Sequence, residues 1–353
     1  MRLRIAMTTI GTLALTLALA ACNDQANGGD AGSRDQIKIV GSSTIYPFTT
    51  LVAEQFVNKN PGNKAPVVES TGTGGGMKLF CGGVGARFPD IANASRRITA
   101  AEYQTCETNG VNRIMEVQIG LDGIAFATAT NGPKLQLTPA DIYLALAAMP
   151  RGAKNTAKTW KDVNPSLPAT PIQVYGPPAT SGTRDALVEL ILARGCEAIY
   201  PDSIGMKTRK PADYDAACKR IRDDGAYSDA GENDNLIVQK LQSNPNAVGI
   251  FGYSYLEENG STLAGVPIGG VLPSYETIAA GTYPGSRPLY IYVKKAHIGA
   301  IRGLDKFVEL YTQMIGPEGP LVKRGLIAAP QPVRDASAEI VKKSSALNPD
   351  TLK

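Results

Sequence analysis

The sequence has very little of the chemistry that hydrolytic enzymes and structural metal sites require. His297 is the only histidine among 353 residues, and no Cys-x-x-Cys pair occurs. Hydrolases usually need clustered metal ligands or a nucleophile beside a base. Ser181, the best candidate nucleophile, has neither a Gly-x-Ser-x-Gly elbow nor a neighbouring histidine. We therefore predict a protein that is not an enzyme and has no metal or cofactor.

A strong excess of charge of either sign is also missing. The chain has 36 Lys and Arg against 32 Asp and Glu, a net charge of +4, and the basic residues are scattered. This argues against nucleic-acid binding, although a mildly basic surface suits an anionic ligand. With 43% hydrophobic and 19% charged residues the chain is globular. Its length allows two ordinary domains.

Long apolar runs are absent except near the N-terminus. Residues 10–21 are rich in Ala and Leu but too few to span a bilayer in a mature protein. They end in Leu19-Ala20-Ala21-Cys22, a sequence typical of a lipoprotein signal. We predict a signal peptide over residues 1–21, a lipid on Cys22 and a polar, flexible tether over residues 22–35. Simple cleavage after Ala20 or Ala21 is the alternative. If Cys22 carries a lipid, we expect the rest of the mature chain to be soluble and to lie in the periplasm or at the cell surface, held to a membrane only by that lipid.

Cysteines are few, and their number is odd. If Cys22 carries the lipid, four of the five remain, and an exported protein meets an oxidising compartment in which disulfides persist. Two local pairs, Cys81–Cys106 and Cys196–Cys218, would each close a modest loop and stabilise the fold by roughly 3 kcal/mol. Four cysteines allow three pairings, and free buried thiols are a further alternative.

Short apolar segments alternate with amphipathic ones along the rest of the chain, which predicts an α/β fold with largely parallel sheet. Strands are expected at 37–40, 67–70, 90–95, 123–127, 172–175, 249–253 and 289–293, and helices from Pro47 and over 77–80, 186–192, 236–241 and 300–314. The element order predicts a chain that leaves one domain, forms a second and returns. We predict one lobe from 36–128 plus 287–347, a second from 129–286, and a ligand site in the cleft between them.

Three loops share one design: Gly41–Thr44, Ser70–Gly76 and Thr180–Thr183 each follow a strand, are rich in Ser, Thr and Gly, and open a helix. The first turn of a helix has N–H groups without intrahelical partners and carries partial positive charge. Such loops suit an anion. Each alone is more simply a helix cap, but three together favour a ligand site. The glycine run Gly74–Gly76 is hard to explain by folding, because glycine weakens a helix start.

These motifs carry a family resemblance. Gly41-Ser42-Ser43-Thr44-Ile45-Tyr46-Pro47-Phe48, Ser70-Thr71-Gly72-Thr73-Gly74-Gly75-Gly76 and Ser181-Gly182-Thr183 resemble the three ligand loops of the phosphate-binding components of ABC phosphate importers, and Asp90 to Arg96 resembles the fourth element. The resemblance implies a two-lobed type II periplasmic-binding fold, a desolvated inorganic phosphate and delivery to a membrane permease by a monomer. The ligand-binding residues it implies are Ser42, Ser43, Thr44, Ile45, Thr73, Gly74, Ser95, Arg96, Ser181, Gly182, Thr183 and Arg184.

Two departures from the family pattern leave alternatives open. Arg96 stands where the family has the Asp that accepts the proton of hydrogen phosphate, and residues 176–179 lack the family's arginine. Arg184 either replaces that arginine or forms a surface ion pair, and a surface ion pair is also an alternative for Arg96. Asp185 either supplies the missing carboxylate or only pairs with Arg184. The competing ligands are therefore sulfate, molybdate, a phosphonate or a phosphate ester, and a surface lipoprotein used in adhesion or signalling is a further alternative.

Overall fold

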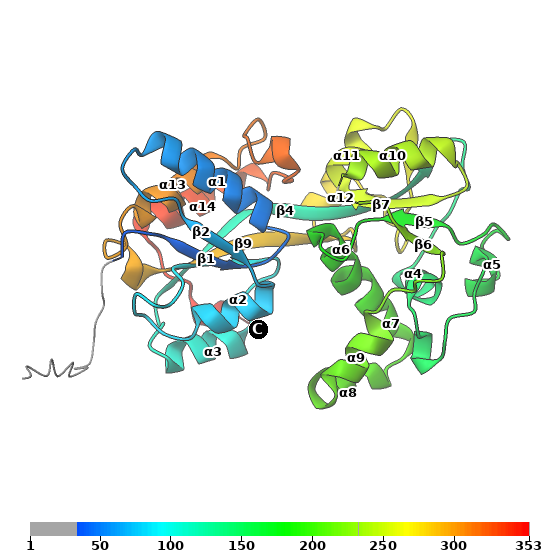
Figure 1. The fold of residues 1–353 in the computed structure, drawn as a ribbon, viewed down its shortest axis with the longest axis horizontal. Coiled ribbons are helices and arrows are strands. Elements are labelled where there is room, and N and C mark those ends of the chain that lie inside the picture. The colour runs from blue at the N-terminus through cyan, green and yellow to red at the C-terminus, as the bar shows by residue number, and fades with distance from the viewer. Residues whose placement is uncertain (1–33, 232, 353) are drawn as a thin grey trace, which may run out of the picture. The chain divides into compact units, whose positions relative to one another are not determined.

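The computed structural model describes residues 34–231 and 233–352, which belong to one compact unit. Its centre is a nine-stranded sheet with the order β2-β1-β3-β9-β4-β7-β5-β6, and β8 pairs with β4 (Figure 1). The strands are β1 (Lys38–Gly41), β2 (Val67–Ser70), β3 (Ile91–Ala94), β4 (Ile114–Ala129), β5 (Val174–Gly176), β6 (Tyr227–Asp229), β7 (Val248–Gly252), β8 (Leu263–Gly265) and β9 (Ser286–Lys294). Each predicted strand overlaps one of these.

The sheet is mixed. β1 runs parallel to β2 and β3, and β5 runs parallel to β6 and β7. The two long strands, β4 and β9, are antiparallel to each other and to their other neighbours. The prediction of a largely parallel sheet therefore holds for the outer strands and not for the centre, where β9 returns beside β4 from far along the chain.

β4 and β9 join the two groups of parallel strands. Residues 114–123 of β4 pair with β9, and residues 124–127 of the same strand pair with β7. The predicted boundaries at 128/129 and 286/287 thus fall at the end of β4 and at the start of β9. Figure 1 shows both strands running between the groups of helices.

Helices connect the strands in the order expected for alternating α/β segments. They are α1 (Tyr46–Lys59), α2 (Thr73–Phe80), α3 (Ala100–Thr108), α4 (Pro139–Leu146), α5 (Trp160–Val163), α6 (Gly182–Ala186), the π-helix η2 (Leu187–Leu192), α7 (Ala193–Ile199), α8 (Asp202–Arg209), α9 (Pro211–Cys218), α10 (Asp234–Ser243), α11 (Tyr253–Glu258), α12 (Tyr275–Ala279), α13 (Leu304–Gln313) and α14 (Gln331–Lys343). The predicted helices are confirmed, though the one expected over 186–192 is a π-helix flanked by α-helices.

Three clusters of buried side chains stabilise this arrangement. One packs Phe56, Phe307 and their neighbours around β1 and β9, and another packs Phe126 and Trp160 around β4, β5 and β7. The third lies beneath α2 and α3 and includes Phe80. Burial of apolar surface is the main favourable contribution to folding, so each group of strands has a core of its own.

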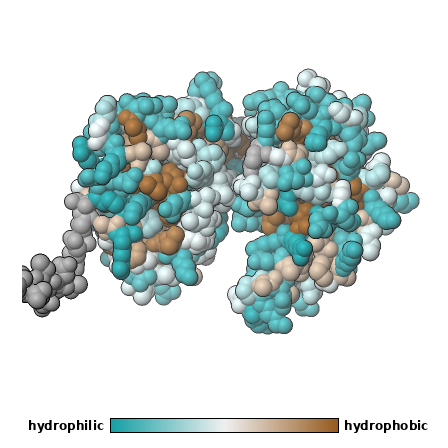
Figure 2. All heavy atoms as spheres, in the orientation of Figure 1, coloured by the Kyte–Doolittle hydropathy of each residue, from teal (hydrophilic) through white to brown (hydrophobic). Residues whose placement is uncertain are grey.

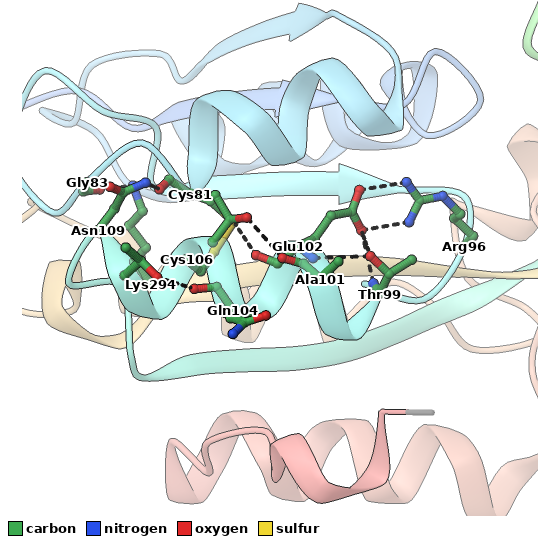
Figure 3. The surroundings of a disulfide bond; sticks show 12 residues. Cys81, Gly83, Arg96, Thr99, Ala101, Glu102, Gln104, Cys106, Asn109 and Lys294 are labelled. Atoms are coloured by element: carbon green, nitrogen blue, oxygen red, sulfur yellow. Dashed lines mark hydrogen bonds and ion pairs between the residues drawn. A yellow bond between two sulfur atoms is a disulfide. The ribbon is translucent and has the colours of Figure 1, made fainter. Parts of the chain in front are cut away.

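Both predicted disulfides are present. Cys81–Cys106 joins the end of α2 to α3, as Figure 3 shows, and Cys196–Cys218 joins α7 to the end of α9. Pairing of cysteines 25 and 22 residues apart restricts the unfolded chain. The first disulfide therefore ties α2, which follows one of the predicted anion loops, to α3, and the second ties α9 to α7.

The surface is mostly polar. In Figure 2 hydrophilic residues cover most of the visible face, and the hydrophobic patches are small and separate. Large exposed hydrophobic side chains include Tyr46, Leu79, Met149, Ile204, Leu236, Leu272 and Tyr275. Between residues 34 and 352, leaving out residue 232, no helix has the length and apolar character needed to cross a bilayer. The predicted signal peptide, the lipid site Cys22 and most of the tether lie outside the described residues. Arg34, near the end of the tether, forms an ion pair with Asp90 in the fold.

Candidate functional site

The Gly41–Thr44 loop is fixed by contacts between backbones. Gly41 has φ of +127°, and a Cβ there would lie 2.2 Å from the carbonyl oxygen of Asn93. A Cβ on Gly76, in the first turns of α2, would lie 2.4 Å from the Cα of Gly41. Glycine is required at both positions because no side chain can move to relieve such contacts. One glycine of the run 74–76 is thus explained by packing, while a Cβ at Gly74 would meet nothing within 4 Å.

This loop presents backbone donors. The N–H of Ser42 donates to the carbonyl of Asn93 at 3.0 Å. The next three N–H groups, those of Ser43, Thr44 and Ile45, donate no hydrogen bond within the described part of the chain. The side chain of Ile45 is fully buried in the core and that of Ser42 is 2% exposed. Residues 43–45 can therefore serve a ligand through their backbone N–H groups.

Thr73 and Ser95 are brought together from different elements. Their hydroxyl oxygens are 3.0 Å apart, and the N–H of Ser95 donates to Thr73 Oγ1 at 3.1 Å. Thr73 opens α2 after β2, and Ser95 follows β3. These strands flank β1 and run parallel to it, so both hydroxyls lie at the carboxyl ends of parallel strands. We refer to residues 41–45, 70–76 and 91–95 as the first side of the site.

The second side is formed by residues 180–192. Ser181 caps α6 by accepting a hydrogen bond from the N–H of Thr183 at 3.2 Å. A Cβ on Gly182 would lie 2.5 Å from the Cα of Thr44, and Thr44 Oγ1 donates to the carbonyl of Gly182 at 3.3 Å. The hydroxyl of Ser43 donates to the carboxylate of Asp185. The Gly41–Thr44 and Ser181–Thr183 motifs, far apart in sequence, are thus in direct contact.

Arg96 is held by a carboxylate from its own side. Its guanidinium donates to both oxygens of Glu102, at 2.8 and 2.7 Å, and Glu102 also completes a capping box with Thr99 at the start of α3 (Figure 3). The hydrogen bond from Glu102 raises the pKa of Arg96 above its usual value. The guanidinium is 43% exposed. An ion pair, one of the two readings of Arg96 from the sequence, is therefore present.

Arg184 is held by residues that flank the second side. It donates to the carbonyl of Pro177 at 3.1 Å, and its guanidinium carbon lies 4.4 Å from the centre of the Tyr227 ring. Burial raises the pKa of Tyr227 to about 12. The hydrogen bond that the structure gives Asp185 is from Ser43 and not from Arg184. The carboxylate of Asp185 thus faces the first side.

Sequence reasoning missed a buried ionic cluster next to these loops. Arg287, on β9, donates to Asp122 at 3.1 Å, to Glu189 at 2.6 Å and to Thr44 Oγ1 at 2.9 Å. Burial raises the pKa of Asp122, although Arg287 acts in the opposite direction. The available signal was a single charge within each of two apolar runs, at 119–124 and at 287–293. A charge in such a run is seldom buried without a partner.

A cleft of about 590 Å³ opens beside the cluster. Ser95 and Arg96 line it from the first side and Glu189 from the second, with Arg287 between them. Further along, the cleft is lined by Arg97, Arg194, Lys207, Tyr214, Asp215 and Lys219 among others. No group of three or more potential metal-ligating side chains occurs among residues 34–231 and 233–352. Of the predicted ligand-binding residues, Ser95 and Arg96 line this cleft. The guanidinium groups among its lining residues recognise anions.

In open α/β sheets, ligands bind in the cleft beside the carboxyl ends of the strands, where the loops of this site lie. Residues 26–313 match the PBP superfamily domain, and the chain belongs to that superfamily. It is 32% identical to Protein SphX of Synechococcus elongatus, over 78% of this chain and 73% of that protein. It is 28% identical to the phosphate-binding protein PstS of Staphylococcus saprophyticus, over 91% of this chain and 89% of that protein. The crystal structure of a possible phosphate-binding protein from Planctomyces limnophilus matches with a TM-score of 0.69 and 28% identity, covering 89% of this chain and 99% of that one.

Proposed function

We propose that this protein binds inorganic phosphate outside the cytoplasm and delivers it to an ABC permease for import. The observation that carries the proposal is the convergence of the four loop elements, with their N–H groups and hydroxyls, in a member of the PBP superfamily. The name of the Staphylococcus saprophyticus relative, phosphate-binding protein, supports the choice of ligand and a binding rather than a catalytic role.

The residues that we propose to bind the anion are those with hydrogen-bond donors at the meeting point of the two sides. The N–H groups of residues 43–45, the hydroxyls of Thr73 and Ser95, and the Ser181–Thr183 turn would surround the anion. Charge-assisted hydrogen bonds contribute about 1.5–3 kcal/mol each, so several of them can hold a dehydrated phosphate. Ile45 and Gly74 would act through their backbone N–H groups, since the side chain of Ile45 is buried and Gly74 has none. The N–H of Ser42 donates to Asn93, so Ser42 would support the loop and not donate to the anion. Arg96 and Arg184 would reach the anion only by leaving their present partners.

Asp185 favours phosphate over sulfate as the ligand. Its carboxylate accepts the hydrogen bond of Ser43 and so lies at the meeting point of the two sides. An ionised carboxylate can only accept hydrogen bonds, and hydrogen phosphate has a proton to donate, whereas sulfate near pH 7 has none. Asp185 would thus take the role of the family carboxylate that Arg96 replaces.

The proposal includes two lobes, 36–128 plus 287–347 and 129–286, that close on the anion. The separate cores of the two strand groups, and their connection through β4 and β9, support this division. It also includes export by the signal at 1–21 and a lipid on Cys22, which the two disulfides support because such bonds persist in oxidising compartments. The protein would then be a monomer tethered by residues 22–35 at the periplasmic or outer face of a membrane.

Calorimetric titration tests the proposal. The purified full-length protein, stripped of bound ligand by partial unfolding and refolding, is titrated with phosphate, sulfate and phosphate esters at pH 7. Tight binding of phosphate and weak binding of sulfate are expected. Preferred sulfate or ester binding, or no phosphate binding, would overturn the proposal.

The Asp185→Asn variant sharpens the same titration. Without the carboxylate, phosphate loses its proton acceptor, and the preference for phosphate over sulfate should fall by about tenfold or more, as expected for loss of one charged hydrogen bond. Asp213→Asn, an exposed carboxylate on α9, is the matched control and should leave the preference unchanged.

A further inference from the structure

Arg287 lies between the two sides of the site with part of its hydrogen-bonding capacity unused. Its side chain is 6% exposed and lines the cleft next to Ser95. Of the five N–H donors of a guanidinium, three are used by Asp122, Glu189 and Thr44. Two donors therefore remain for a ligand that enters the cleft.

Resting on the proposed anion site, we propose that Arg287 is an arginine of that site and that Glu189 is a built-in competitor, which the incoming oxyanion displaces from Arg287. A guanidinium binds oxyanions with two parallel hydrogen bonds, as it binds carboxylates, so a carboxylate and a phosphate can compete for it. Arg287 then supplies the arginine that residues 176–179 lack.

The position of Glu189 fits a displaceable group. Its side chain, which accepts from Nη1 of Arg287, is 53% exposed, whereas that of Asp122, which accepts from Nε, is 15% exposed. An exposed ion pair stabilises a protein little, so the carboxylate can rotate into water at low cost, while Asp122 cannot. Glu189 also lies on the π-helix η2. Short π-helical turns inside α-helices occur frequently at functional sites.

Charge explains why the two anions exclude each other. While Glu189 pairs with Arg287, its carboxylate offsets the positive charge that would attract an incoming anion, and it repels that anion directly. The field of Glu189 also reaches Arg96, whose pKa is raised mainly by the hydrogen bond from Glu102 and additionally by Glu189. Glu189 lines the same cleft as Arg96 and Arg287, where the oxyanion would bind.

One variant of Glu189 and one of Asp215 test whether Glu189 competes with the oxyanion for Arg287. In Glu189→Gln the competing charge is lost, and phosphate should bind about two- to fivefold more tightly by titration calorimetry, as expected for release of an exposed ion pair. Asp215→Asn removes one negative charge from the wall of the same cleft, where Asp215 pairs with Lys219, and it controls for the general field. Its gain should be smaller than that of Glu189→Gln. An equal gain in the two variants, or unchanged or weaker binding in Glu189→Gln, overturns the competition.

Arg287→Lys tests the other half of the inference. Lysine keeps the charge beside Asp122 but not the paired geometry, and phosphate affinity should fall at least about tenfold with an unchanged melting temperature. Unchanged affinity would mean that Arg287 does not bind the anion. If this variant does not fold, the comparison of Glu189→Gln with Asp215→Asn still decides. Failure of the wild type to bind phosphate would instead contradict the proposed function, so the two failures are distinguishable.

Discussion

The two sides of the site are built by different forces. On the first side, the backbones of Gly41, Gly76 and Asn93 are in contact, and the N–H of Ser42 donates to Asn93. On the second side, α6 has five residues. Asp185 and Gly182 accept hydrogen bonds from Ser43 and Thr44, and Gly182 also approaches Thr44 closely. Glu189, on the following η2, pairs with Arg287 of β9.

This difference assigns different tasks to the two sides. Backbone packing cannot adjust, so the first side is fixed before a ligand arrives. Beneath it, Thr49 of α1 donates to Asn93 Oδ1 at 3.2 Å and lies 3.0 Å from the hydroxyl of Tyr311, which ties the loop to α13. Side-chain hydrogen bonds with half-exposed partners can exchange for bonds to a ligand, so the second side can move. Substitutions on the first side should therefore affect stability, and those on the second side affinity.

Gly76→Ala should have the largest effect on stability. The new methyl group would lie 2.4 Å from the Cα of Gly41, and backbone shifts of this kind typically cost about 1–3 kcal/mol. Gly75→Ala is the matched control, because its methyl group would meet only Thr71, at 3.6 Å, and alanine stabilises a helix by up to about 1 kcal/mol relative to glycine. Denaturant unfolding of both variants measures the difference. Equal stability of the two would show that the first side is adjustable after all.

The sequence was sufficient for the elements and for the loops, but not for what connects them. Strand and helix positions follow from local apolar periodicity, and Ser, Thr and Gly at strand ends marked the first and second sides. The central antiparallel strands depend on pairing between residues as far apart as Ile114 and Lys294, 180 positions along the chain. The cluster of Arg287 with Asp122 and Glu189 joins residues up to 165 positions apart. No local pattern encodes such a pairing. The glycine run 74–76 was attributed to the ligand, although Gly76 is also required by its contact with Gly41.

Lys294 should make the stability of the first side depend on pH. This residue follows the β9 segment that pairs with β3, is 1% exposed, and donates to the carbonyl of Gly83 at 2.6 Å between the rings of Phe80 and Phe88. Burial of the ammonium group, together with the positive charge of Arg34, lowers the pKa of Lys294 to about 7. The negative charge of Asp90 acts in the opposite direction but is outweighed. The unfolded value is about 10.4.

The sign follows from proton binding. Between pH 7 and 10 the unfolded chain holds a proton on Lys294 that the folded chain has lost, so raising the pH stabilises the fold, and below pH 7 the two states no longer differ at this group. The free energy of unfolding should rise by about 1 kcal/mol per pH unit between pH 7.5 and 9.5. Lys294→Met should abolish this rise, while Lys323→Met, at an exposed lysine, should retain it. A rise of equal slope in both variants would assign the pH dependence to other groups.

Gly182→Ala should change stability least and affinity clearly. Its methyl group would lie 2.5 Å from the Cα of Thr44, so the second side must move away from the first before the contact is relieved. Because alanine is tolerated within α6 itself, the free energy of unfolding should change by less than about 0.5 kcal/mol. Phosphate affinity should nevertheless fall at least about tenfold, since the donors of the two sides no longer converge on one anion.

The control for this variant is Gly260→Ala, whose methyl group would meet backbone atoms only at ordinary distances of 3.7 and 3.8 Å. Titration calorimetry and thermal melts of both variants separate the two quantities. If Gly182→Ala lowered the melting temperature as much as Gly76→Ala while keeping its affinity, the second side would be as rigidly packed as the first. The two sides would then differ in composition but not in mobility, and closure of one on the other could not be the step that captures the anion.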